Sequence, residues 1–143
     1  MSGESLYERL GGTYAIAGAV DVLVDRLFEN AQVNANEGVH AHHGDPANAP
    51  GYKFLVTAWS IEAAGGPKCY PGLDMVAAHQ TLRITPEQFD AVSFEIRATL
   101  KFLGVPLAEE DEFMAIIEHY RPEVVEQSPV APEGTLEPAL AQA

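Results

Sequence analysis

The chain has 143 residues and is 47% hydrophobic, which suits one domain large enough to bury a core. Its formal net charge of -13 comes from 21 acidic residues against 8 lysines and arginines. Because no cluster of basic residues is available to neutralise phosphates, nucleic acid and anionic membrane surfaces are excluded as partners. The single cysteine, Cys69, excludes an internal disulfide. With no signal-peptide pattern and no apolar run near ~18 residues, the sequence predicts a cytoplasmic protein.

Hydrophobic periodicity predicts amphipathic helices along the chain and no strand. Ser5 is placed to cap a short helix that ends at Gly11-Gly12, and apolar residues at helical spacing predict a second helix over about 13–30. Residues 31–50 are rich in Asn, Ala, Gly, Pro and His and have no sustained period. A long loop, with at most a helical turn, is therefore predicted there.

The second half of the chain has clear helix boundaries. A third helix is predicted over about 50–64, where a Gly-Gly-Pro sequence ends it. Thr85, Pro86 and Gln88 match the capped start of another helix, which a Gly-Val-Pro sequence ends. A last helix is predicted over about 107–121.

The residues that follow this last helix differ in composition from the rest of the chain. They hold several prolines, many Glu and Ala residues and no aromatic residue. We therefore expect one domain over residues 1–125 and an acidic, Pro/Ala-rich tail over residues 126–143 that is disordered or loosely packed.

One histidine lies on a predicted apolar helix face. In the stretch DMVAAHQTLRIT, residues 74–85, Met75, Val76, His79 and Leu82 fall at i, i+1, i+4 and i+7. Two interpretations are open from these residues alone. His79 is either a core histidine whose ring nitrogens are bonded to the backbone, or a ligand of a metal or cofactor.

Several motifs in the chain match one family. The segment SLYERLGGTYAI is similar to the opening of the group 1 truncated haemoglobins. Further along, Gly65-Gly66-Pro67, Tyr70-Pro71-Gly72, Met75 with His79, Ile84-Thr85, Phe89-Asp90 and the segment TLKFLGVP also resemble that family. The resemblance extends from residue 5 to about 125 and is weakest over 33–49.

The resemblance implies an all-α, two-over-two globin sandwich that encloses haem b. It makes His79 the proximal iron ligand, and the second ring nitrogen of His79 then needs an acceptor, which we expect to be a backbone carbonyl one turn earlier. Lys53 and Arg83 are the expected partners of the haem propionates. The expected haem contacts are Val24, Phe28, Tyr52, Leu55, Val56, Trp59, Met75, Ile84, Phe89, Val92 and Ile117.

The chain departs from the family on the distal side of the haem. The position that matches the family's distal tyrosine is Val24, and the ligand-facing positions of the third helix are Tyr52, Leu55 and Val56. Because Tyr52 is the single hydrogen-bond donor among these four, we expect weak retention of oxygen.

Three histidines in the predicted loop leave the distal side open to other chemistry. His42 or His43 could fold inward as a sixth iron ligand. Alternatively, His40, His42 and His43 bind a separate divalent metal, or they are solvated and have no specific role.

The function implied by the resemblance is reversible binding of a diatomic gas, O2, NO or CO. The alternatives are a haem-dependent redox enzyme of the NO dioxygenase or peroxidase type, and a hexacoordinate redox or sensor globin. A cofactor-free helical module in which His79 is structural is the third possibility. We also expect an unidentified electron donor as a partner, and a protein that is a monomer or a weak homo-oligomer.

Overall fold

The computed structural model describes residues 3–125 of the chain. The predicted tail at 126–143 lies outside the described residues. Within residues 3–125, the single extended pairing is an isolated parallel bridge between Ile84 and Val125. The helices in chain order are α1 (Leu6–Arg9), α2 (Gly12–Glu29), α3 (Ala31–Asn34), α4 (Glu37–His43), η1 (Pro46–Asn48), α5 (Ala49–Ala63), α6 (Met75–His79), α7 (Pro86–Phe102), α8 (Leu107–His119) and α9 (Arg121–Val124).

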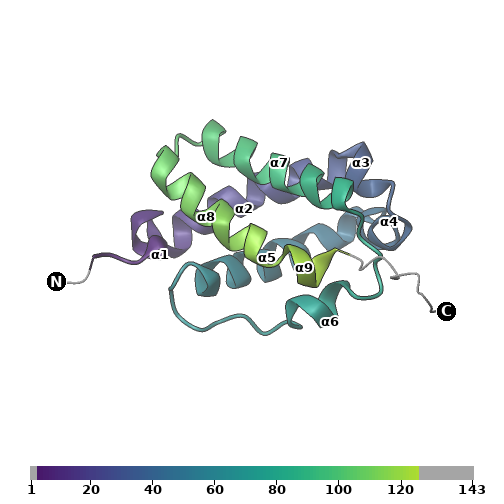
Figure 1. Cartoon of the computed structure of the whole chain (residues 1–143), viewed down its shortest axis with the longest axis horizontal. Coiled ribbons are helices and arrows are strands. Elements are labelled where there is room, and N and C mark those ends of the chain that lie inside the picture. Colours follow the sequence, from purple (N-terminus) through teal and green to yellow (C-terminus); the bar gives the residue numbers. More distant parts are fainter. Residues whose placement is uncertain (1–2, 126–143) are drawn as a thin grey trace.

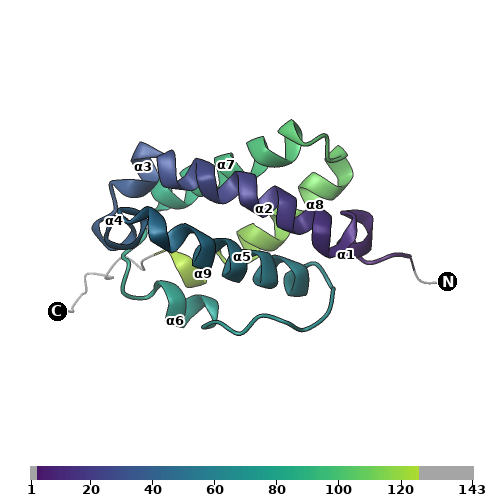
Figure 2. The same ribbon diagram turned by 180° about the vertical axis from the view of Figure 1, so that it is seen from behind.

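Two antiparallel helix pairs make up the body of the domain. Helix α2 packs along α5, and α7 packs along α8, while α2 and α7 join the two pairs (Figures 1 and 2). This arrangement confirms the predicted all-α, two-over-two sandwich. None of the helices between residues 3 and 125 combines the length and the apolar character that crossing a bilayer needs.

The predicted helix starts are confirmed where the sequence carries a capping box. The Ser5 hydroxyl accepts the Glu8 N–H at the start of α1, and the Glu8 side chain bonds the Ser5 N–H in return. Thr85 and Gln88 make the same reciprocal pair at the start of α7. Each box satisfies backbone donors that a helix end otherwise leaves without a partner.

Both Gly-Gly pairs have a steric reason. Gly11 and Gly12 have φ of 103° and 81°, in the left-handed region that favours glycine. At the end of α5, a Cβ on Gly66 would lie 2.6 Å from the Tyr7 ring. The Tyr7 N–H also donates to the Ala64 carbonyl at 2.8 Å. Together these contacts dock α1 on the end of α5.

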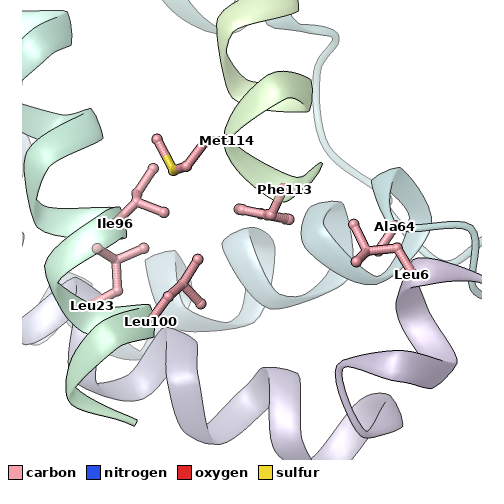
Figure 3. Close-up of a cluster of buried hydrophobic side chains, with 7 residues drawn as sticks. All are labelled: Leu6, Leu23, Ala64, Ile96, Leu100, Phe113 and Met114. Carbon is pink, nitrogen blue, oxygen red and sulfur yellow. The ribbon is translucent and has the colours of Figure 1, made fainter. Parts of the chain in front are cut away.

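The core consists of two clusters of buried apolar side chains. The larger cluster joins α1, α2, the end of α5, α7 and α8, and Figure 3 shows its members Leu6, Leu23, Ala64, Ile96, Leu100, Phe113 and Met114. The smaller cluster lies between α2 and α5 and consists of Ile16, Val20, Val24 and Ile61. Burial of these side chains fixes α2 and α5 relative to one another and so positions the inner face of α5.

The prediction of a long loop over 31–50 is wrong. The segment forms α3, α4 and η1, each of which begins at a side-chain cap. The caps are Asn30, Asn36 and Asp45, whose side-chain oxygens accept backbone N–H groups two or three residues later. These helices are too short to be stable alone, so periodicity does not reveal them.

Candidate functional site

His79 is the last residue of α6. The helix begins at Asp74, whose side chain accepts the Ala77 N–H at 2.8 Å. One turn of helix brings His79 Nδ1 to 2.8 Å from the Met75 carbonyl oxygen, which confirms the expected backbone acceptor. Because a carbonyl can only accept, Nδ1 donates, so a neutral His79 ring carries its hydrogen on Nδ1 and presents Nε2 as the nitrogen with a free lone pair. This is the tautomer that a metal ligand requires.

The apolar face that contains His79 is shorter than predicted. Helix α6 ends at His79, and the Leu82 N–H donates to the His79 carbonyl at 2.9 Å in the turn that follows. Leu82 therefore does not continue the face formed by Met75, Val76 and His79. Helix α6 packs against α9.

Apolar side chains on one face of α5 and on α6 are incompletely covered by protein. On α5 these are Tyr52, Leu55, Val56 and Trp59, and on α6 they are Met75 and Val76. None of them is buried, and Leu55 and Val76 are 36% and 46% exposed. Residues 65–74 connect the two helices as an extended segment (Figures 1 and 2). An apolar ligand would cover both faces, which fits a large apolar cofactor.

An aromatic cluster lies where α4 meets α2 and α5. The His43 ring stacks on Phe28, with 4.3 Å between ring centroids and 20° between planes. Tyr52 meets both rings edge-on, at 5.8 Å from Phe28 and 5.3 Å from His43. His43, which is half-buried, is thereby fixed next to a predicted ligand-facing position of α5.

Asn34 determines the tautomer of His43. Its side-chain Nδ2 donates to the carbonyls of Leu27, Phe28 and Asn30, at 2.8 to 3.1 Å, which fixes the orientation of the amide. The other amide atom, Oδ1, is an acceptor and lies 3.0 Å from His43 Nδ1. His43 Nδ1 therefore donates, and His43 Nε2 is unprotonated like that of His79. Burial lowers the pKa of His43, and the neighbouring histidines lower it further, which favours the neutral ring.

The other two histidines of α4 are exposed. His42 lies edge-on to Tyr52, with 6.3 Å between ring centroids, and His40 lies on the same helix. Within residues 3–125 no group of three histidine, cysteine or acidic side chains could hold a metal ion. The alternative of a separate metal at His40, His42 and His43 therefore has no support from the geometry.

The expected donor on the distal side, Tyr52, is half-buried, and burial raises the pKa of its hydroxyl. No side chain or backbone group in residues 3–125 makes a hydrogen bond to that hydroxyl. Val24, at the position of the family's distal tyrosine, is 2% exposed and packs in the α2–α5 cluster.

The remaining expected contacts lie around these faces as part of the core. Ile84 and Phe89 are buried, and the Arg121 guanidinium lies 4.4 Å from the centre of the Phe89 ring. Trp59, Val92 and Ile117 pack on the edge of the larger cluster. Trp59 in α5 also meets the ring of Tyr120, the residue before α9, edge-on with 5.6 Å between ring centroids.

The two expected propionate partners differ in their surroundings. Lys53 Nζ lies 2.7 Å from Asp21 and 2.9 Å from Asp25, so its ammonium group ties α5 to α2, and these carboxylates raise its pKa. Arg83 has a left-handed backbone, with φ of 57°, and is exposed after α6. Lys53 was predicted to bind a haem propionate, and the sequence analysis did not identify its ion pairs with Asp21 and Asp25.

A separate apolar cavity of about 350 Å³ lies between α2, α7 and α8. Its walls include Ile16, Leu23, Ile96 and Phe113. It is lined by none of the side chains expected to contact haem, and it is therefore distinct from the site at His79.

Two asparagines that the sequence analysis passed over support the site. Asn34 orients His43, and Asn36 caps α4 and bonds to the turn after α6. The available signal was the Asn-Glu pair at 36–37, since asparagine is a strong N-cap and an acidic residue favours the first helical turn.

Comparison with known proteins identifies the family. A family model described as "Bacterial-like globin" matches residues 5–126. The group 1 truncated haemoglobin GlbN of Synechocystis is 33% identical over 106 residues, which cover 71% of this chain and 80% of GlbN. A group 1 truncated haemoglobin of Tetrahymena pyriformis is 29% identical over 122 residues, which cover 85% of this chain and 95% of the relative.

The chain belongs to the group 1 truncated haemoglobins. Solved structures agree: the 2/2 haemoglobin of Synechococcus, in the cyanomet state with covalently attached haem, has a TM-score of 0.74 at 30% identity and covers 85% of this chain and 98% of its own. The truncated haemoglobin of Tetrahymena pyriformis, in the Fe(III) form, has a TM-score of 0.72 at 30% identity and covers 87% and 100%. As a member of this family, the protein is a haem-binding globin.

Proposed function

We propose that this globin binds haem b and that His79 is the proximal iron ligand. The observation that carries the proposal is the 2.8 Å hydrogen bond from His79 Nδ1 to the Met75 carbonyl, because it makes Nε2 the nitrogen that the neutral ring presents to a metal. A neutral imidazole that a backbone carbonyl orients through its other nitrogen is well suited to bind haem iron.

The uncovered apolar faces of α5 and α6 give the second support. A porphyrin is a large apolar ring, and burial of apolar surface stabilises a complex by about 25 cal/mol per Å². Leu55, Val56, Trp59, Met75 and Val76 would contact it, since protein leaves them half-buried or exposed. The proposed contacts from the surrounding core and cluster are Val24, Phe28, Tyr52, Ile84, Phe89, Val92 and Ile117.

We propose that the ligand is a diatomic gas, O2, NO or CO. When bound, ferrous haem supplies an axial position that such a molecule can occupy. Val24, Leu55 and Val56 exclude water and offer no donor, and the Tyr52 hydroxyl is the single candidate donor among these positions, so we expect weak retention of oxygen. Arg83 stays a proposed propionate partner, whereas Lys53 would first have to leave Asp21 and Asp25.

His43 supports a second candidate function, a hexacoordinate redox or sensor globin. The Asn34 contact gives His43 the same tautomer as His79, and the Phe28 and Tyr52 rings restrict its position. A neutral Nε2 on the α4 side is a suitable sixth ligand for iron. His42, which is exposed, is the weaker candidate.

The proximal assignment is tested by visible spectroscopy of the purified protein titrated with haem. We expect the parent protein and His119→Ala, altered at an exposed histidine of α8, to bind one haem with the same ferrous spectrum. His79→Ala should bind haem more weakly and lose that spectrum. An unaltered ferrous spectrum in His79→Ala would refute the assignment.

The role of His43 is tested on the ferrous protein without added gas. A six-coordinate, low-spin spectrum that becomes five-coordinate in His43→Ala, but not in His42→Ala, would support the sixth-ligand proposal. A five-coordinate spectrum in the parent would contradict it.

Gas binding is proposed ahead of a dedicated redox enzyme. NO dioxygenation needs an electron donor, which remains an unidentified partner, and peroxidase chemistry needs an acid–base group near the iron. His43 Nε2 is the candidate for that group, so peroxide turnover that His43→Ala abolishes would favour the enzyme. We further propose a monomer or weak homo-oligomer in the cytoplasm, where the exposed Cys69 thiol stays reduced.

A further inference from the structure

Asn36 is a buried polar side chain with a complete set of partners. It is 6% exposed. Its Oδ1 accepts the Val39 N–H at 2.9 Å, which caps α4. Its Nδ2 donates to the carbonyls of Leu82 and Arg83, at 2.7 and 3.2 Å, and lies 2.9 Å from Gln88 Oε1. A cap needs only the first of these contacts, so the remaining three need another explanation.

Those contacts reach the turn that directly follows His79. The Leu82 N–H donates to the His79 carbonyl at 2.9 Å, and the Leu82 carbonyl in turn accepts from Asn36. A continuous series of hydrogen bonds therefore runs from the Met75 carbonyl, through the His79 ring and backbone, to Asn36. Asn36 is 43 positions before His79 in the sequence, and it contacts the proximal segment only through the fold.

The turn itself has an unfavourable backbone that needs outside support. Arg83 has φ of 57°, a conformation that a residue with a Cβ rarely adopts. The Asn36 side-chain amide stabilises this conformation by donating a hydrogen bond to the Arg83 carbonyl. The start of α4 also lies close to the turn, since a Cβ on Gly38 would come within 2.9 Å of Leu82 Cδ2 and 3.3 Å of its Cα.

We propose that Asn36 is a positioning residue for the proximal ligand: it fixes the turn at Leu82 and Arg83, and thereby the direction of the His79 imidazole. It also joins α4, which carries His43, to the segment that carries His79. This inference rests on the proposed role of His79 as iron ligand.

The test compares Asn36→Ser with the matched control Asn30→Ser. Serine keeps an N-cap oxygen at both positions. Asn30 caps α3 and donates from Nδ2 to Glu95 at 2.7 Å, so its substitution removes a similar bond away from α6. Each variant is loaded with haem, and the iron–histidine stretching band of the five-coordinate ferrous protein is recorded by resonance Raman spectroscopy, with His43→Ala added to every variant if the parent protein is six-coordinate. The rate of haem loss to an excess of a haem-scavenging apoprotein is measured beside it.

We expect Asn36→Ser to shift or broaden the iron–histidine band and to speed haem loss by roughly two- to tenfold, the range for one or more lost hydrogen bonds. Asn30→Ser should leave the band unchanged. Gly38→Ala leaves Asn36 in place but displaces Leu82, so it should also shift the iron–histidine band. It replaces Asn36→Ser in the test if that variant does not fold. An unshifted band in the variant or variants that fold, or an equal shift in Asn30→Ser, would overturn the inference.

Failure of this inference is distinguishable from failure of the proposed function. If the parent band is lost in His79→Ala but unaffected by Asn36→Ser and Gly38→Ala, His79 is the ligand and Asn36 does not position it. If the band survives in His79→Ala, the proposed function fails, and with it the positioning role.

Discussion

On the α6 side of the proposed haem site, His79 is oriented by a carbonyl of its own helix, whereas on the α4 side His43 is oriented by Asn34 from α3. The first contact joins residues four apart, Met75 and His79. The second joins residues nine apart, in two helices that meet through the fold. Both produce an imidazole with an unprotonated Nε2.

This difference shows that a local hydrogen bond and a tertiary hydrogen bond can favour the same histidine tautomer. The local hydrogen bond sets the tautomer of His79 and depends on helix formation from Asp74, so it survives as long as α6 does, whereas the proposed role of Asn36 concerns the direction of the ring. The tertiary hydrogen bond depends on the Asn34 amide, on ring stacking with Phe28 and on the packing of α3 and α4. The α4 side should therefore respond more strongly to substitutions outside the histidine itself.

Among the substitutions that test this comparison, Asn34→Ala is expected to have the largest effect on stability. Three backbone carbonyls and the His43 ring lose their partner, so the free energy of unfolding should fall by about 1–3 kcal/mol. Urea unfolding of the haem-free protein measures it. The control is Asn48→Ala, at an exposed residue that donates to the His42 carbonyl, where a change within about 0.5 kcal/mol is expected. Equal losses in the two variants would show that Asn34 has no special role.

A smaller effect is expected from acid on the α4 side. The pKa of His43 is lowered in the folded protein, mainly by burial, while in the unfolded chain it is about 6.5. Below about pH 6.5 the unfolded chain therefore binds a proton that the folded protein does not, and stability falls as the pH drops through this window.

This pH dependence is measured as the free energy of unfolding of the haem-free protein at pH 7.5 and pH 5.5. His43→Gln should lose less stability between the two values than the parent does, while His119→Gln should match the parent. If His43→Gln and the parent lose the same amount, the burial argument for His43 is incorrect.

The smallest effect is expected from Tyr52→Phe. The Tyr52 hydroxyl has no partner in residues 3–125, so its removal should change stability by less than about 0.5 kcal/mol. We also expect the oxygen dissociation rate of the ferrous protein to change less than twofold. A two- to tenfold faster dissociation, measured by stopped-flow mixing, would mean that this hydroxyl donates to the bound gas after all.

The parts of the molecule that the sequence predicted are those that local rules control. The cap at Ser5, the capping box at Thr85, the breaks at the Gly-Gly pairs and the backbone acceptor of His79 all depend on residues within one or two helical turns. The family resemblance added the two-over-two arrangement, which periodicity alone does not give.

The parts that the sequence did not predict depend on contacts between distant residues. Helix α4 has seven residues, and its cap, Asn36, also donates to carbonyls 46 and 47 positions away. The ion pairs of Lys53 with Asp21 and Asp25 likewise follow from how α2 packs on α5. Neither can be derived from spacing, because only the packed fold brings these groups together.

The most direct test of the central role of His79 is rescue of a His79→Gly variant by free imidazole. Removing the side chain leaves a space that imidazole can occupy as an untethered ligand. We predict that haem-loaded, ferrous His79→Gly lacks the parental iron–histidine band and that added imidazole restores an iron–imidazole band and the parental visible spectrum. A band that is already present without imidazole would contradict the assignment of His79 as the proximal ligand.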